Sequence, residues 1–219
     1  MDPSAEQNAT IEAFTTAVFE NRFDEALQHA SPGSAAERYV THQKALATGL
    51  SANGEGQSDP STDPTLSFDG DVVTVSQAGT VYTLSDYTFD ADGLVTGWTG
   101  KSGPVANVLW TQPWSGQAGG NSVELVSAYK ANAGTLYVIL KVTAGAGTIT
   151  PNGYSATYSA SDGITYSAGG ASQPREIAAG SAGYVILTFD GAPFGGTVNF
   201  DGTSPDDYSI SWAASIPVV

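Results

Sequence analysis

The chain lacks cysteine and has only two histidines and seven basic residues among its 219 positions. Without cysteine it can form no disulfide bond, and it offers no thiolate for catalysis or metal binding. Charged residues make up 13% of the chain, well below the usual ~25%. The 22 acidic residues give a net charge of −15, which repels nucleic-acid phosphates and anionic lipid head groups. We therefore expect no nucleic-acid partner.

Long apolar runs are also missing. No run approaches the roughly 20 residues that a membrane-spanning helix needs, so no membrane-spanning segment is predicted. The stretch from Met1 to Ser4 is neither basic nor hydrophobic, as a signal peptide would be. Whether a signal peptide or lipid anchor precedes Met1 in the natural precursor stays open.

Helical periodicity is confined to roughly residues 4–50. Ser4 and Gln7 have the spacing of a capping box, which predicts the start of a helix. The apolar residues that follow fall on one helical face. They are Ile11, Phe14 and Val18.

Two further helices are expected in this region. A short one is indicated around residues 26–30, before Pro32 and Gly33. A second capping box at Ser34 and Glu37 predicts a third helix, which Gly49 is expected to end.

The apolar period changes after a loop. Residues 51–65, SANGEGQSDPSTDPT, contain many Gly, Pro, Asn and Asp and are predicted to be a surface loop. From residue 72 onward, alternating apolar residues predict strands, and Asp90-Ala91-Asp92-Gly93 predicts a hairpin turn. Helices followed by an antiparallel meander indicate an α+β N-terminal domain, assigned to residues 1–103.

Residues 104–219 show only strand patterns. The clearest candidates are residues 134–143 and 184–189, and the second is apolar on both sides, which predicts a central strand. Seven or eight short strands separated by turn residues indicate an all-β immunoglobulin-like sandwich. The predicted fold is therefore an α+β domain followed by this β-sandwich.

Two family resemblances accompany this pattern. The run FTTAVFENRFDEALQHASPGSAAERY, with the later YTFDADGLVTGWT, resembles the NTF2-like (cystatin-like) superfamily over roughly residues 4–102. The run VELVSAYKANAGTLYVILKVT and the later GYVILTFDG resemble immunoglobulin-like and telokin-like domains of exported actinobacterial lipoproteins, over about residues 105–219. The first resemblance implies a cone-shaped domain with a pocket, and the second implies secretion or attachment to the cell envelope.

Candidate site residues follow from the NTF2-like resemblance, which implies a site among inward-facing residues. A histidine beside a carboxylate can act as a general base. The four residues implied are Tyr39, His42, Asp86 and Trp98. The simpler interpretation, which we favour, is that both histidines face solvent on helices. An alternative ligand-binding role predicts an apolar pocket, lined by Phe14, Val18, Tyr39, Tyr82, Phe89 and Trp98.

No metal site or cofactor is expected. The histidines lack metal-ligand spacing, and no dinucleotide or phosphate-binding motif is present. The turn at residues 90–93 fails as an EF-hand, because Thr99 stands where a bidentate Glu is required. The acidic segments are interpreted as turns between strands, with adventitious calcium binding left open.

Trp110 and Trp114 lie where the two predicted domains join. Exposed tryptophans can stack on sugar rings, which makes carbohydrate binding a hypothesis. The favoured interpretation is that this pair packs between the domains.

These observations predict a non-catalytic binding or structural module that is secreted or belongs to the cell envelope. The expected partner is a protein or a cell-envelope component, and a homodimer is left open. Two alternatives stay open: a small-ligand or carbohydrate-binding protein, and an NTF2-like enzyme with a His or Asp general base.

Overall fold

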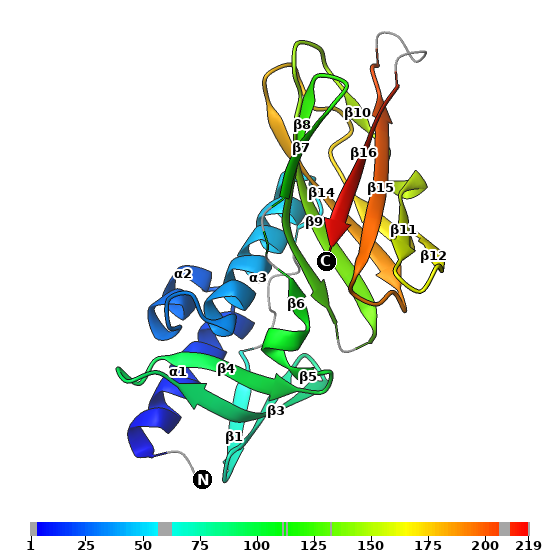
Figure 1. Ribbon diagram of the computed structural model, residues 1–219. Coiled ribbons are helices and arrows are strands. Elements are labelled where there is room, and N and C mark those ends of the chain that lie inside the picture. The colour runs from blue at the N-terminus through cyan, green and yellow to red at the C-terminus, as the bar shows by residue number, and fades with distance from the viewer. Residues whose placement is uncertain are drawn as a thin grey trace. The chain divides into compact units, whose positions relative to one another are not determined.

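The computed structural model describes residues 4–56, 63–110, 112, 114–131, 133–205 and 211–218. The chain divides into two compact units, shown in Figure 1. Unit 1 comprises residues 1–44 and 58–109, and unit 2 comprises residues 45–57 and 110–219. The contiguous domains expected from the sequence, 1–103 and 104–219, stay a prediction.

Unit 1 begins with helix α1 (Ala5–Phe19). The expected capping box is confirmed, because the Ser4 side chain accepts from the Gln7 N–H while the Gln7 side chain accepts from the Ser4 N–H. Ile11 and Phe14 are buried, as the periodicity predicts. The expected second helix is a single turn, α2 (Phe23–Ala26), which continues as the 3-10 turn η1 (Leu27–His29).

Helix α3 (Ala35–Ala52) does not end at Gly49 as the sequence predicts. Its residues 45–52 belong to unit 2, where Gly49 lies against strand β14 (Ala182–Asp190). A Cβ atom at Gly49 would lie 2.9 Å from Ile186 Cδ1 and 3.0 Å from Tyr184 Cβ. Close packing therefore requires the glycine here, and the left-handed residue after the helix is Gly54, with φ of 77°.

Unit 1 contains a five-stranded antiparallel sheet, called the first sheet, in the order β1-β2-β3-β4-β5. Its strands are β1 (Thr65–Asp69), β2 (Val72–Gln77), β3 (Thr80–Phe89), β4 (Val95–Gly100) and β5 (Gly103–Pro104). The predicted turn between β3 and β4 is confirmed. The Asp90 carboxylate accepts from the N–H groups of Asp92 and Leu94, and Gly93 has a φ of 78°.

Unit 2 contains two antiparallel sheets. In the second sheet β15 lies between β16 on one side and β10 and β11 on the other, and β12 pairs with β11. In the third sheet the order is β13-β14-β9-β8-β6, and β7 also pairs with β8. Strands of the second sheet are β10 (Thr150–Pro151), β11 (Thr157–Ala160), β12 (Thr165–Ser167), β15 (Gly196–Thr203) and β16 (Ser211–Val218). The other strands of the third sheet are β6 (Leu109–Trp110), β7 (Trp114–Ala118), β8 (Asn121–Lys130), β9 (Thr135–Thr143) and β13 (Gly170–Ser172).

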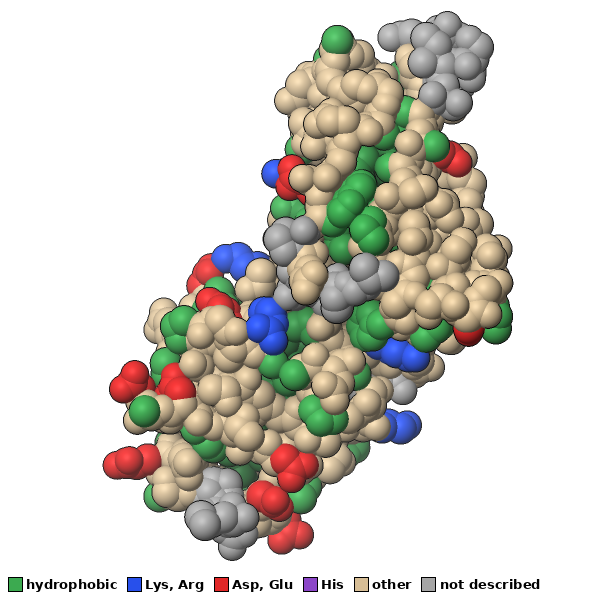
Figure 2. Space-filling model, in the orientation of Figure 1, with side chains coloured by type: hydrophobic (Ala, Val, Ile, Leu, Met, Phe, Trp, Pro, Cys, Tyr) green, Lys and Arg blue, Asp and Glu red, His purple; other side chains and the backbone are tan. Residues whose placement is uncertain are grey.

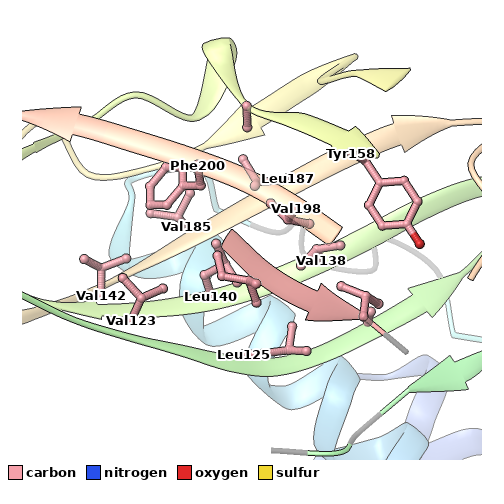
Figure 3. Packing of buried hydrophobic residues seen from close by; sticks show 14 of the residues in the cluster. Val123, Leu125, Val138, Leu140, Val142, Tyr158, Val185, Leu187, Val198 and Phe200 are labelled. Atoms are coloured by element: carbon pink, nitrogen blue, oxygen red, sulfur yellow. The ribbon is translucent and has the colours of Figure 1, made fainter. Parts of the chain in front are cut away.

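Both sheets of unit 2 contribute to one buried apolar cluster, shown in Figure 3. Strand β9 supplies the side chains whose alternation the sequence predicts, and Tyr158, Val198 and Phe200 come from the second sheet. The β9 residues in this cluster are Leu136, Val138, Leu140 and Val142, and Ile139 is buried on the other face of the strand. The prediction that residues 184–189 form a central strand is confirmed, because β14 pairs with β13 and β9.

The predicted fold class, an α+β domain followed by an all-β immunoglobulin-like sandwich, is wrong. The described chain is mostly β, with three antiparallel sheets and three short α-helices near the N-terminus. The helices occur close to where the sequence predicts them, but strands run through both units and make up most of the regular structure. Asn21, with a φ of 59°, interrupts the chain between α1 and α2, so the two do not form a longer helix.

Among the described residues, none of the helices has the length and apolar content needed to span a membrane. The expectation of no membrane-spanning segment agrees with this finding for that part of the chain.

Candidate functional site

The aromatic rings of Phe14, Tyr39 and Tyr87 contact Trp98 on β4 of unit 1. The ring of Phe14, from α1, lies with its centroid 5.4 Å from that of Trp98. The ring of Tyr39, from α3, meets Trp98 edge-on at 5.0 Å, and that of Tyr87, from β3, stacks at 6.1 Å. The structure therefore brings together two of the predicted site residues, Tyr39 and Trp98, within an aromatic cluster.

Three of the residues expected to line an apolar pocket, Phe14, Tyr39 and Trp98, belong to this aromatic cluster. Phe14 and Trp98 are buried and in ring contact, and Tyr82 makes an edge contact with Phe19 at 5.0 Å. Rings at these distances fill the space between the elements that carry them. Their arrangement is that of a packed core, which stabilises unit 1.

His42 lies one helical turn after Tyr39 on α3, and its side chain is 1% exposed. Burial disfavours the charged imidazolium and lowers the pKa of His42 from 6.5 to about 3. The favoured expectation of a solvent-facing His42 is therefore wrong, because the face of α3 that bears His42 is buried. At neutral pH the imidazole is uncharged.

Asp86 occupies a different environment from His42. It is exposed on β3, with a φ of 51°, where the register between β3 and β4 shifts. Its carboxylate accepts a hydrogen bond from the Ser85 hydroxyl at 3.0 Å. Asp tolerates the left-handed conformation better than most residues, so a backbone irregularity accounts for its position.

The structure describes only one of the two predicted tryptophan side chains. Trp110 ends β6, and its side chain lies outside the described part of the structure. Trp114, on β7, is partly buried against the apolar cluster of unit 2. Its ring lies over Gly116, where an added Cβ atom would stand 2.6 Å from the ring. Packing within unit 2 therefore accounts for Trp114.

No group of three or more His, Cys, Asp or Glu residues that could hold a metal ion occurs in the described ranges. In the turn at residues 90–93 the Asp90 carboxylate accepts hydrogen bonds from groups of the protein itself. Hydrogen bonds from the Ser31 hydroxyl and from the N–H groups of Leu94, Asp92 and Gly93 lower its pKa, partly offset by desolvation. This turn is accordingly a structural one.

Unit 2 presents a polar face that the sequence analysis did not identify. On the second sheet, alternate residues point away from the apolar cluster, and those on neighbouring strands form rows. We call this set the polar face. One row is Ser167, Thr157, Asn199 and Ser215, and the next is Thr165, Ser159, Thr197 and Pro217. Strand alternation could have indicated these positions, but only pairing shows that they share a face.

Hydrogen bonds connect the side chains of the polar face. The Asn199 amide donates to the Ser159 hydroxyl at 3.3 Å and accepts from the Ser215 hydroxyl at 2.9 Å. Asp201, two residues further along β15, points to the same side. Its carboxylate accepts from the Ser155 hydroxyl at 3.2 and 3.3 Å.

Tyr154 precedes Ser155 in the 3-10 turn η3 (Gly153–Ser155) and is 70% exposed. The backbone fixes this turn to β15, because the Asn152 N–H donates to the Asp201 carbonyl at 3.0 Å. The segment Pro151-Asn152-Gly153 before it is a turn pattern that could have predicted an exposed aromatic residue here.

Comparisons with known proteins do not assign the chain to a family. No protein-family model and no curated protein matches it. The chain is similar to the crystal structure of a functionally unknown protein from Listeria monocytogenes EGD-e, with 8% sequence identity. The match covers 51% of this chain and 85% of that chain, at a TM-score of 0.34. The comparisons therefore give no support to the NTF2-like or immunoglobulin-like resemblance.

Proposed function

We propose that the chain is a non-catalytic binding or structural module, secreted or associated with the cell envelope. The observation that best supports this proposal is the separation of the candidate catalytic groups. His42 is buried and uncharged in the core, whereas Asp86 is exposed at a strand irregularity. A general base must reach a substrate proton, and it works best with a pKa near the operating pH. Neither requirement suits a buried histidine with a pKa of about 3.

The surface composition supports a role in binding. In Figure 2 the visible side chains of unit 2 are mostly neutral, with few acidic or basic groups. Apart from Pro217, the two rows of the polar face consist of Ser, Thr and Asn, which can both donate and accept hydrogen bonds. The location outside the cytoplasm rests on the sequence resemblance of residues 105–219 to exported actinobacterial lipoproteins. The proposed partner is an envelope component or another protein.

Two measurements test this proposal in the cells that produce the protein. Intact cells are labelled with an amine-reactive biotin reagent that does not cross membranes, and the protein is then captured with a specific antibody. In parallel, purified protein is sedimented with isolated cell envelopes. We expect biotin labelling before lysis and co-sedimentation with the envelopes.

The double variant His42→Gln with Asp86→Asn is the control for a catalytic role. We expect it to co-sediment as the unchanged protein does, because neither group takes part in binding. Labelling only after lysis would overturn the proposed location. Loss of binding in the double variant, with the fold intact by circular dichroism, would show that His42 or Asp86 takes part in binding, contrary to this proposal.

A further inference from the structure

We propose that the polar face of unit 2, with Tyr154 at its rim, binds a neutral polysaccharide chain. This inference rests on the proposed function as a binding module and names the partner class. Four observations support it: the charge of the face, the presence of only one apolar residue, Pro217, in its two rows, its hydrogen-bond pattern and the exposure of Tyr154.

Charge favours a neutral partner. The two rows of the polar face contain no charged residue, and Asp201 beside them is the one acidic group described on those strands. No Lys or Arg is present there to pair with the anionic groups of an acidic polymer. With a net charge of −15, the chain as a whole repels such polymers. A basic partner would find one carboxylate, that of Asp201, on the described strands of this face.

The residue types of the face argue against a protein partner. The buried centre of a protein interface is usually apolar and rich in aromatic residues. Apart from Pro217, both rows consist of Ser, Thr and Asn side chains. A protein surface, including that of a second copy, would therefore gain little apolar burial here. A polysaccharide presents hydroxyl groups that can replace water at each of these positions.

Several polar side chains of the face are held by hydrogen bonds to neighbouring side chains. Asn199 is held between Ser159 and Ser215, and Asp201 is held by Ser155. Groups ordered in advance lose less conformational entropy on binding than free side chains would. Each hydroxyl retains lone pairs or a proton for a further hydrogen bond. The face can thus both donate to and accept from sugar hydroxyls.

Tyr154 adds an aromatic surface at the rim of the polar face. Its side chain is 70% exposed, while the turn that carries it is bonded to β15 through Asn152 and Ser155. An aromatic ring has a negative face that attracts the slightly positive C–H groups of a sugar ring. An exposed ring on a turn held by hydrogen bonds loses little conformational entropy when it binds a ligand.

Affinity electrophoresis of the full chain tests the inference. Native gels contain hydroxyethylcellulose, dextran or soluble starch as neutral probes, and carboxymethylcellulose is the anionic counterpart of the first. We expect retardation in at least one neutral gel. We expect no retardation in carboxymethylcellulose if hydroxyethylcellulose is the neutral probe that binds. No retardation in any neutral gel, or equal retardation by both cellulose derivatives, would overturn the inference.

Three variants locate the binding site. Tyr154→Ala is expected to lower the affinity for the neutral probe that retards the unchanged chain by roughly three- to tenfold. Tyr154→Trp keeps an aromatic surface and is expected to keep the affinity. Tyr137→Ala, on the third sheet, is the matched control and should bind as the unchanged chain does. Full binding by Tyr154→Ala would show that the site lies elsewhere.

Sedimentation velocity distinguishes a second copy from a polysaccharide. A dimer that Tyr154→Ala dissociates would mean that the face serves self-association, which would overturn the inference. A negative result in the gels would not bear on the proposed location or on the role of His42. Those are tested separately by surface labelling and envelope sedimentation.

Discussion

The hydroxyl groups of Thr15 and Tyr87 lie 3.0 Å apart and share a hydrogen bond, although the residues are 72 positions apart in the chain. Thr15 is buried on α1 and Tyr87 is on β3, so this bond connects the first helix to the first sheet. Burial raises the pKa of the Tyr87 phenol above its ordinary value, which the bond to Thr15 partly counteracts. The bond therefore gives each of these two hydroxyl groups a hydrogen-bond partner in place of the water lost on burial.

Tyr87→Phe is expected to lower the free energy of unfolding by about 1–3 kcal/mol, because the Thr15 hydroxyl loses its partner in a buried place. Urea denaturation followed by circular dichroism measures the change. Combining it with Thr15→Val removes both polar groups, so the double variant should be less destabilised than the sum of the single variants. Strict additivity would show that the two side chains do not interact.

His42 makes the stability of the protein depend on pH. The folded-state pKa of His42 is about 3 and the ordinary value is 6.5, so between these values the unfolded chain binds a proton that the folded chain does not. The stabilisation is complete above pH 6.5 and is lost as the pH falls towards 3. The expected loss from this group is up to about 1.4 kcal/mol per pH unit.

Urea unfolding at pH 7, 6, 5 and 4 measures this dependence, and His42→Gln is expected to make it shallower. The comparison of slopes cancels the contributions of the many carboxylates. His29→Gln is the control, because it removes the other histidine and leaves His42 in place. A slope for His42→Gln equal to that of the unchanged protein would contradict the assignment of His42 as a buried, uncharged group.

Gly49→Ala is expected to destabilise the protein by about 1–3 kcal/mol, because the new methyl group would press on Ile186 and Tyr184. In an open helix the same change would stabilise by up to about 1 kcal/mol. Ser51→Ala, at an exposed position of α3, is the control and should leave stability unchanged or slightly raised. Thermal unfolding measures both variants. Stabilisation by Gly49→Ala would show that the helix does not pack closely here.

Ala78 stands in the two-residue turn between β2 and β3, with a φ of 49°, and Gly79 follows with a φ of 78°. Such a turn needs positive φ at both positions and favours Asn-Gly. Ala78→Asn should therefore raise the free energy of unfolding by about 0.5–1 kcal/mol. Ala91→Asn is the control, because Ala91 does not have a positive φ. An equal effect of both substitutions would refute this explanation.

Features that depend on residues close in sequence were predicted well. The Ser4–Gln7 capping box and the Asp90–Gly93 turn consist of neighbouring residues whose hydrogen bonds form locally. The alternation of β9 likewise needs only the two-residue period of a strand. The candidate site was predicted less well, since only Tyr39 and Trp98 proved to be in contact.

The sequence by itself determined where helices give way to strands, because the spacing of apolar residues fixes the face that each element must bury. Only the tertiary structure decided that His42 is buried and that Gly49 lies inside a helix. It also decided that Ser159, Asn199 and Ser215 share one face. Each of these facts depends on which distant strand or helix packs alongside, and strand pairing brings together side chains that no local period relates.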